Sequence, residues 1–190
     1  PDFVETPGGY LLDPAYIEKR RALIKSHRRM TNAIARPGIP ENWLSSRHKK
    51  SLKKSSDNSI KPPGTTHLSI VDQSGNIVSM TSTIENAFGS RLMTNGFFLN
   101  NELTDFSFAP TRNGWEVANK VEPGKRPRSS MSPTIIFNAD GSPFLVVGSA
   151  GGSRIIGYVL KTIIHVIDWK TPFDDALAAP HFLSRGPITG

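Results

Sequence analysis

A glycine–threonine pair, Gly64–Thr65, marks the boundary between a basic, polar stretch and a segment that alternates like a β-strand. The hydroxyl of an internal threonine is a poor nucleophile because it needs a base. If the Gly64–Thr65 bond were cut, Thr65 would gain an α-amine with a pKa of about 7.7–8.0 beside its own hydroxyl. That pairing is a known route to covalent catalysis. From spacing alone, a purely structural threonine is the more common reading.

A glycine-rich stretch, Gly148–Ser153, precedes a segment with helical periodicity. Glycines at a helix start let backbone N–H groups converge without side-chain obstruction, and the helix dipole favours negative charge there. Gly151 and Gly152 are therefore candidate donors of an oxyanion hole. A simple turn that caps the helix explains the same residues equally well. The stretch is not a phosphate-binding loop, because the required Gly-Lys-Ser/Thr is missing.

The elements that must position these residues are predicted from apolar periodicity and turn residues. The predicted strands cover 66–71, 77–83, 97–99, 133–137 and 143–147, and the predicted helices cover 13–30, 154–168 and 171–179. The first and last helices begin with a capping residue followed by proline. Strands followed by helices favour an α+β layer structure over a doubly wound parallel sheet.

The net charge of +7 over 190 residues lies entirely in the first third. Residues 1–64 hold 13 Lys and Arg against 6 Asp and Glu, whereas residues 65–190 hold ten of each. The basic stretch 45–64 has too few apolar residues to fold and is predicted to be a disordered linker. Only Leu52 and Ile60 in it are large and apolar, and no aromatic residue lies among the lysines, so it offers no base-stacking platform and predicts no nucleic-acid partner.

Several classes of site are excluded by composition. The chain has no cysteine, which excludes disulfides and zinc sites built on thiolates. Its five histidines show no metal-ligand spacing, so neither a metal nor another cofactor is predicted.

No apolar run reaches the roughly 18 residues of a membrane span. The chain begins with proline and has no signal-peptide pattern at that end, so residue 1 is not expected to be a natural start.

Four sequence blocks occur in a fixed order and resemble one known family. They read TTHLSIVDQSGNIVSMTSTIENAFGS (65–90), NNELTDFS (100–107), KRPRSSMSPTI (125–135) and GSAGGSRI (148–155). Their order and spacing resemble the small subunit of γ-glutamyltranspeptidase. The resemblance implies an N-terminal nucleophile hydrolase with an αββα sandwich, partial here because the family's chains are much longer. Its implied parts are 1–44, the end of the large subunit; 45–64, the linker to the self-cleavage point; and 65–190, the small-subunit catalytic region without its C-terminal end.

The resemblance also implies catalytic roles for single residues. Autoproteolysis between Gly64 and Thr65 would make Thr65 the nucleophile and, through its amine, the base. Thr83 would hydrogen-bond Thr65 and help to position it. Gly151 and Gly152 would supply the oxyanion hole. His67 lies on the same strand face as Thr65, but it is interpreted as structural because the threonine amine already serves as the base.

Substrate-binding roles follow from the same resemblance. Ser129 and Ser130 would hydrogen-bond the substrate α-carboxylate, and Asp105 with Glu102 would hold its α-ammonium. Glu85 stands where many family members have asparagine. A glutamate keeps the acceptor and adds charge, which would either strengthen ammonium binding or reshape the pocket for another acyl group.

The implied activity is transfer and hydrolysis of γ-glutamyl amides such as glutathione, with water, an amino acid or a peptide as acceptor. The missing large-subunit region would complete the site, so this piece alone is expected to be inactive. Family resemblance suggests a periplasmic or extracellular location. One alternative is an acylase for glutaryl or cephalosporin side chains, which would not need the acidic residues. Another is a non-catalytic basic binding module, which the charge distribution argues against.

Overall fold

The computed structural model describes residues 6–28, 30, 38–45 and 64–183. Helices and strands both occur, so the predicted α+β class is confirmed. The chain divides into two compact units, one containing 1–56 and 109–125 and the other containing 57–108 and 126–183. The linker predicted over 45–64 lies almost entirely outside the described residues, and the division at 44 and 64 stays a prediction.

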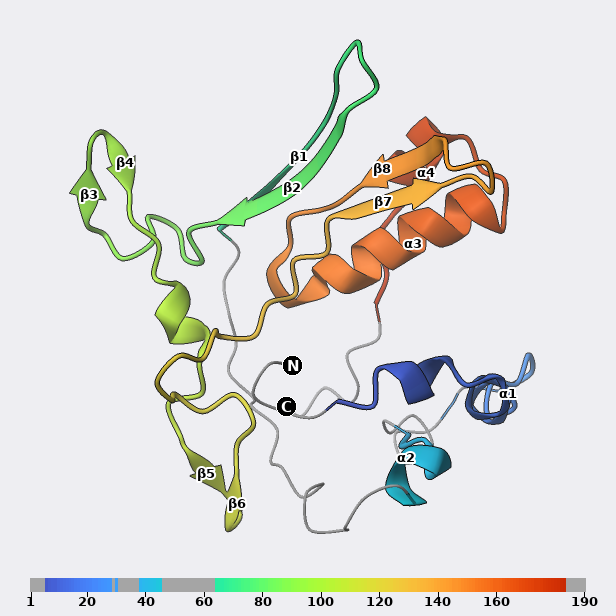
Figure 1. Ribbon diagram of the computed structural model, residues 1–190, viewed down its shortest axis with the longest axis horizontal. Helices are drawn as coiled ribbons and strands as arrows, with labels where there is room; N and C mark the ends of the chain where they lie inside the picture. Colours follow the sequence, from blue (N-terminus) through green and yellow to red (C-terminus); the bar gives the residue numbers. More distant parts are fainter. Residues whose placement is uncertain (1–5, 29, 31–37, 46–63, 184–190) are drawn as a thin grey trace. The chain divides into compact units, whose positions relative to one another are not determined.

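The first unit contains short elements (Figure 1). They are η1 (Gly9–Leu12), α1 (Pro14–Arg21), α2 (Glu41–Ser45), β5 (Thr111–Arg112) and β6 (Trp115–Glu116). The Asp13 carboxylate caps α1 by accepting the N–H groups of Ala15 at 2.8 Å and Tyr16 at 3.4 Å. The predicted start is therefore confirmed.

The prediction that this first helix continues to about Met30 is wrong, because α1 ends at Arg21. The N–H groups of Leu23 and Ile24 bond to carbonyls three residues back, a tighter turn that commonly closes a helix. Three basic residues, Lys19, Arg20 and Arg21, occupy the last turn. Cations are favourable at the negative end of the helix dipole, so the charge pattern supports a helix end here.

The second unit contains the predicted strands and the longest helix. Its elements are β1 (Thr65–Val71), β2 (Ile77–Thr83), β3 (Met93–Thr94), β4 (Phe97–Phe98), η3 (Glu102–Asp105), β7 (Thr134–Phe137), β8 (Pro143–Val147), η4 (Gly152–Arg154), α3 (Ile155–Ile167) and α4 (Phe173–Ala178). Across the described residues of both units, the strands pair as four antiparallel hairpins. The predicted helices at 154–168 and 171–179 are confirmed with slightly shorter bounds. Thr171 does not cap α4, whose N-cap is Pro172 without a side-chain hydrogen bond.

The turn between β1 and β2 fixes the register of the hairpin that carries the candidate nucleophile. The Asp72 carboxylate accepts the backbone N–H groups of Ser74 and Asn76 and the side-chain amide of Asn76, at 2.7–2.8 Å. These bonds, led by the Asn76 side chain, hold the pKa of Asp72 below its ordinary value. Gly75 has a φ of 81°, a conformation that glycine adopts without strain. The resulting register pairs Thr65 with Thr83 at the open end.

The core of the second unit lies between the β7–β8 hairpin and α3, which run side by side (Figure 1). Leu145 and Val147 are two positions apart on β8 and so lie on one face of the strand. Ile155 and Val159 lie one turn apart on α3, and all four side chains are buried. The strand period of two and the helix spacing of four therefore place apolar residues on the facing surfaces. None of the helices in the described ranges is long and apolar enough to cross a membrane.

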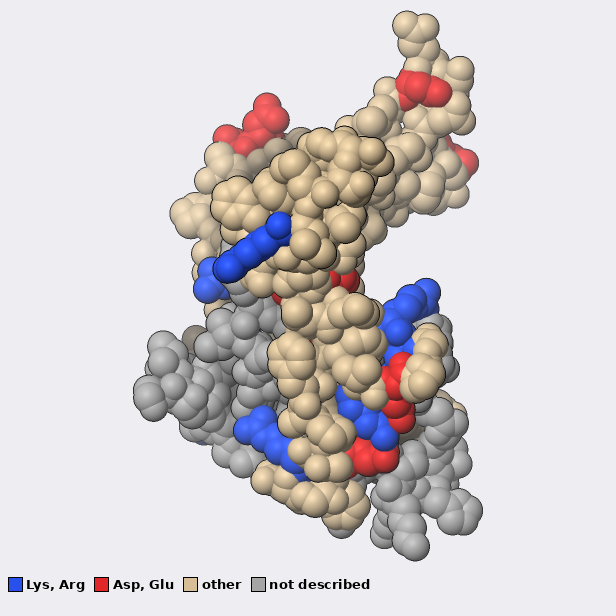
Figure 2. All heavy atoms as spheres, turned by 90° about the vertical axis from the view of Figure 1, so that its left-hand side faces the viewer, with Lys and Arg blue, Asp and Glu red and all other residues tan. Residues whose placement is uncertain are grey.

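Charged side chains of the described residues are dispersed on the face shown in Figure 2. Lysine and arginine lie among aspartate and glutamate there and do not form one broad basic area. Much of the basic stretch 45–64, which carries a large part of the positive charge, lies outside the described residues.

Truncation of Ile155, which is 1% exposed, tests this core. Ile155→Ala should lower the free energy of unfolding by about 2–5 kcal/mol, because it removes buried methyl groups and leaves a cavity. Ile155→Val should cost only about 0.5–1.5 kcal/mol. Urea unfolding followed by circular dichroism measures both. Equal stability of the two variants and the wild type would contradict the described packing.

Candidate active site

The hydroxyl of Thr65 lies against that of Thr83 across the open end of the β1–β2 hairpin. Thr65 Oγ1 donates to Thr83 Oγ1 at 3.1 Å, and the backbone N–H of Glu85 donates to the same oxygen at 2.9 Å. Thr83 in turn donates to the carbonyl oxygen of Gly64 at 3.2 Å. The Thr83 hydroxyl thus connects the candidate nucleophile to the peptide bond that precedes it.

The Gly64 carbonyl has a second donor, the backbone N–H of Ile84 at 3.1 Å. Two donors on one carbonyl oxygen polarise it and stabilise negative charge that develops there. A Cβ on Gly64 would lie 2.5 Å from the Glu85 carbonyl oxygen and 2.9 Å from that of Asn86. Only glycine therefore fits at position 64 without a backbone shift. The sequence analysis missed Ile84, because a backbone donor leaves no mark in residue identity.

Three carboxylates, those of Glu85, Glu102 and Asp105, each offer an oxygen, and these oxygens all lie within 4.8 Å of one another. Glu102 and Asp105 are three residues apart on η3, which places them on one side of a 3₁₀ turn. Glu85 joins them because the adjoining loop is tied to Asn101, immediately before η3. Asn101 donates its N–H to the Ile84 carbonyl at 3.3 Å, and its side-chain oxygen accepts the N–H of Asn86 at 3.0 Å.

Like charges this close repel each other unless a cation or proton lies between them. An ammonium group is one suitable cation, and oxygen-binding metal ions such as Mg²⁺ or Ca²⁺ are another class that carboxylates accept. Asp105 is 7% exposed, so part of the cluster is shielded from water. Glu85 has a φ of 68°, in the left-handed region that a glutamate rarely occupies. The structure thus places the three acidic residues that were predicted from sequence close to one another.

Gly151 and Gly152 lie at the start of η4 and α3, as predicted. Their φ values are 138° and 57°, both in the positive range. Gly151 is the N-cap residue of η4 and makes no side-chain capping bond, but its carbonyl accepts the N–H of Arg154 at 3.2 Å. The first amides of a helix have no partner within it and point outward. This geometry suits a site for developing negative charge, and it equally caps the helix.

His67 links the strand of Thr65 to the glycine-rich stretch. Its Nδ1 lies 2.8 Å from Thr81 Oγ1 and its Nε2 lies 3.1 Å from Ser69 Oγ. A Cβ on Gly148 would overlap the imidazole ring, with Cε1 only 2.1 Å away. Partial burial lowers the pKa of His67, which favours the neutral ring. With both nitrogens bonded to other hydroxyls, His67 packs between strand and loop, in agreement with its structural interpretation.

Ser129 and Ser130 lie in the extended stretch that precedes β7. Ser129 Oγ accepts the N–H of Met131 at 3.2 Å, and the Ser130 carbonyl accepts from Ser132 Oγ at 3.0 Å. These bonds are all local. Among the described contacts of the two serines, none joins them to the acidic cluster or to Thr65, so their substrate role stays a prediction.

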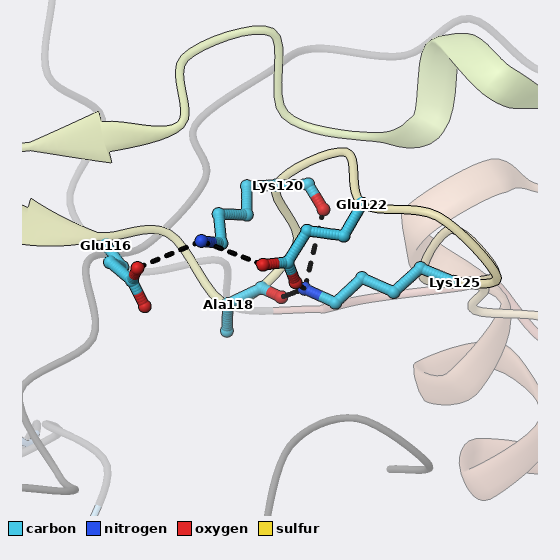
Figure 3. A network of polar contacts seen from close by, with 5 residues as sticks. All are labelled: Glu116, Ala118, Lys120, Glu122 and Lys125. Carbon is cyan, nitrogen blue, oxygen red and sulfur yellow. Dashed lines mark hydrogen bonds and ion pairs between the residues drawn. The ribbon is translucent and has the colours of Figure 1, made fainter.

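The loop that leads to these serines is held by a polar network (Figure 3). Lys125 Nζ donates to the Ala118 carbonyl at 3.1 Å and pairs with Glu122 at 2.5 Å. Lys120 pairs with Glu116 at 2.9 Å and with Glu122 at 2.8 Å. The two lysines, Lys120 first, lower the pKa of Glu122. The Lys125 side chain is 6% exposed, so its backbone contact is shielded more than the Lys120 pairs.

A cavity of about 290 Å³ lies in the first unit, between α1 and residues 38–42. Its walls are largely apolar and include Tyr16, Leu23 and Ile39, and the ion pair of Lys19 with Glu41 borders it. None of the predicted site residues lines it. The cavity lacks the nucleophile and the carboxylate cluster, so the candidate site is the one built around Thr65.

The second unit's α+β elements and the site around Thr65 can be compared with solved structures, and two similar ones are γ-glutamyltranspeptidases. A threonine-to-alanine mutant of Helicobacter pylori γ-glutamyltranspeptidase is 46% identical, with a TM-score of 0.57 over 63% of this chain and 68% of that one. The Pseudomonas nitroreducens γ-glutamyltranspeptidase in complex with L-DON is 43% identical, with a TM-score of 0.54 over 62% and 66% of the two chains.

Sequence comparisons agree. The family model described as gamma-glutamyltranspeptidase matches residues 1–188, and the chain belongs to this family. The glutathione hydrolase proenzymes of Pseudomonas sp. (strain A14) and Bacillus subtilis (strain 168) are each 40% identical to it, over 189 and 188 residues. These alignments cover 96% and 97% of the chain but only 30% of each relative, so the chain spans about a third of their length.

The network around Lys125 should limit local opening of the 116–125 loop. Lys125→Met should accelerate proteolytic cleavage in this loop several-fold, because the Ala118 carbonyl loses its buried partner. Lys120→Met is the matched control and should have a smaller effect, since its partners are more exposed and screened by water. Limited proteolysis with mass mapping measures both rates. The assignment fails if the two variants are cleaved at the wild-type rate.

Proposed function

We propose that the full-length protein is a precursor that cleaves itself between Gly64 and Thr65 and then acts as a γ-glutamyltransferase and glutathione hydrolase. The observation that carries this proposal is the shared hydrogen bonding of the Thr65 hydroxyl and the Gly64 carbonyl through Thr83. The names of the two relatives, both glutathione hydrolase proenzymes, support it.

Self-cleavage would begin with attack of Thr65 Oγ1 on the Gly64 carbonyl carbon. The proton of the attacking hydroxyl would pass to Thr83 Oγ1 while the Thr83 proton passes to the Gly64 oxygen. The Ile84 N–H would stabilise the developing oxyanion. The C–N bond between Gly64 and Thr65 would then break as the relayed proton moves from the Gly64 oxygen to the nitrogen, which re-forms the carbonyl and gives an ester. Water would then hydrolyse the ester to the Gly64 carboxylate and a free Thr65 amine and hydroxyl.

In the mature enzyme, the new α-amine of Thr65 would accept the hydroxyl proton as Oγ1 attacks the γ-glutamyl carbonyl. The amides of Gly151 and Gly152 would hold the oxyanion of the tetrahedral intermediate. The leaving amine would take the proton, and the acyl group would remain on Thr65 as an ester. Water, an amino acid or a peptide would then release it as glutamate or a new γ-glutamyl compound.

The acidic cluster is proposed to bind the α-ammonium group of the substrate. An ammonium ion donates three hydrogen bonds, which matches three nearby carboxylates. Ser129 and Ser130 would bind the α-carboxylate from another side. The proposal extends to Glu85, whose extra charge would strengthen ammonium binding relative to an asparagine. A glutaryl or cephalosporin acylase remains the second candidate, because Glu85 could equally reshape the pocket for another acyl group.

The hairpins of this chain are further proposed to join an αββα sandwich in the full-length protein. Support comes from exposed apolar residues on β1 and β2: Ile70, Val71, Val78 and Met80. The large-subunit region would supply partners for such strands and complete the active site. A periplasmic or extracellular location is proposed from family resemblance alone.

Self-cleavage predicts a specific dependence on the Thr65 hydroxyl. In the full-length precursor, Thr65→Ala should leave one uncut chain, whereas Thr66→Ala, at the exposed neighbouring position, should be cut like the wild type. Thr83→Val should slow cleavage by about 10²-fold, because one oxyanion donor and the proton relay are lost. Thr83→Ser should restore much of the rate.

Intact-mass measurement over time follows each precursor. The mass of the released fragments identifies the cut bond, so cleavage elsewhere is distinguished from cleavage at Gly64–Thr65. Normal processing of Thr65→Ala would reject the mechanism, and normal processing of Thr83→Val would remove Thr83 from it.

Substrate choice separates the two candidate activities. The mature enzyme should prefer a γ-glutamyl amide over the matching glutaryl amide by about 10²-fold or more in kcat/KM, because a site built for a polar group disfavours analogues that lack it. Asp105→Asn should reduce this preference about tenfold by weakening ammonium binding. Asp140→Asn, in the exposed β7–β8 turn, is the matched control. Equal kcat/KM for the two amides in the wild type would favour the acylase.

A further inference from the structure

The end of α4 and the segment that follows it are docked along α3 by three of its residues, Gly157, Tyr158 and Lys161. Lys161 is 6% exposed, and its Nζ donates to the carbonyls of Ala176 at 3.0 Å and Ala179 at 2.7 Å. Gly157, one turn earlier, leaves room for Leu183, since a Cβ there would lie 2.5 Å from Leu183 Cδ1. The chain from Ala176 to Leu183 is thus held against one side of α3.

Between these two contacts, the ring of Tyr158 stacks on that of His181. The ring centroids are 3.9 Å apart and the planes differ by 14°. Burial, with a smaller effect of the Lys161 charge, lowers the pKa of His181 and favours its neutral form. A neutral imidazole is not repelled by Lys161, so the stack and the lysine contact are compatible at neutral pH.

The same tyrosine ring touches the glycine-rich stretch. A Cβ on Gly151 would lie 2.8 Å from Tyr158 Cε2 and 3.2 Å from Cδ2, so the ring occupies the space beside the Gly151 Cα atom. Gly151 has a φ of 138° and a ψ of 14°, a conformation that L residues rarely adopt. Glycine has more backbone freedom than other residues, so a neighbouring side chain that packs against it can restrict the direction of its N–H.

We propose that Tyr158, held in place by the stacked ring of His181, is a positioning residue that fixes the Gly151 N–H of the oxyanion hole. Tyr158 acts through Gly151 and does not touch the substrate. Its ring, and not its hydroxyl, performs this role, because the ring atoms Cδ2 and Cε2 lie nearest to Gly151. The inference rests on the proposed function, in which the Gly151 amide stabilises the tetrahedral intermediate.

Kinetics of the mature full-length enzyme with a chromogenic γ-glutamyl anilide provide the first test. Tyr158→Ala should lower kcat per active site about tenfold, a fraction of the 10²–10³ typical for complete loss of one oxyanion donor. KM should stay within about twofold, because the contact acts in the transition state. Tyr158→Phe keeps the ring and should match the wild type. His181→Ala should lower kcat less than Tyr158→Ala, and His181→Phe should restore it.

Active sites are counted by titration with a covalent acylating reagent, so misfolded protein does not lower the measured kcat. A purely structural role of Tyr158 would reduce the number of active sites and leave kcat per site unchanged, which would overturn the inference. Equal loss of kcat in Tyr158→Ala and Tyr158→Phe would also overturn it by assigning the effect to the hydroxyl. A rise in KM at constant kcat would instead place the ring in substrate binding.

Hydrogen exchange tests the positioning without relying on activity. Amides in peptides covering 148–154 should exchange at least about fivefold faster in Tyr158→Ala than in wild type or Tyr158→Phe. Unchanged exchange in Tyr158→Ala would overturn the inference. If the wild type does not turn over γ-glutamyl amides but exchange rises as expected, the proposed function fails while the positioning of Gly151 by Tyr158 stands.

Discussion

The Thr83 hydroxyl is the contact on which the candidate active site depends. It accepts from Thr65 and from the Glu85 backbone and donates to the Gly64 carbonyl. A slip of one residue in the hairpin would turn every side chain to the opposite face and separate the two threonines. The turn at Asp72, seven residues from Thr65 and eleven from Thr83, therefore helps to bring the two threonines together by fixing the hairpin register.

Elements with strong local signals were predictable from sequence. The β1–β2 and β7–β8 hairpins follow from alternation and turn residues, and α3 follows from its apolar spacing. The paired strands β5 and β6 were not predicted, because two-residue strands are too short to show a period. The end of α1 was misplaced because periodicity continues past Arg21, where the backbone has already tightened.

The candidate site could likewise be predicted only in part from the sequence. The identities of Thr65, Thr83 and the three acidic residues carried a family resemblance, and the structure brings each of these two groups together. The donors that act through the backbone, such as the Ile84 N–H, have no sequence signal. Two aromatic rings pack where a glycine leaves room for them: His67 against Gly148 and Tyr158 against Gly151. Such packing depends on the three-dimensional structure and cannot be predicted from one sequence.

Glu85 combines a strained backbone conformation with a place in the acidic cluster. Its φ of 68° carries a backbone strain of about 1–3 kcal/mol, and its carboxylate lies beside two others. Asparagine tolerates the left-handed region better than glutamate and brings no charge. A change to asparagine would thus relieve strain and carboxylate repulsion, and it would remove the charged partner that Glu85 is proposed to offer the substrate ammonium. Under the proposed ammonium role, Glu85 would be a stability–function trade-off concentrated in one residue: the folded chain loses stability and the cation gains a charged partner.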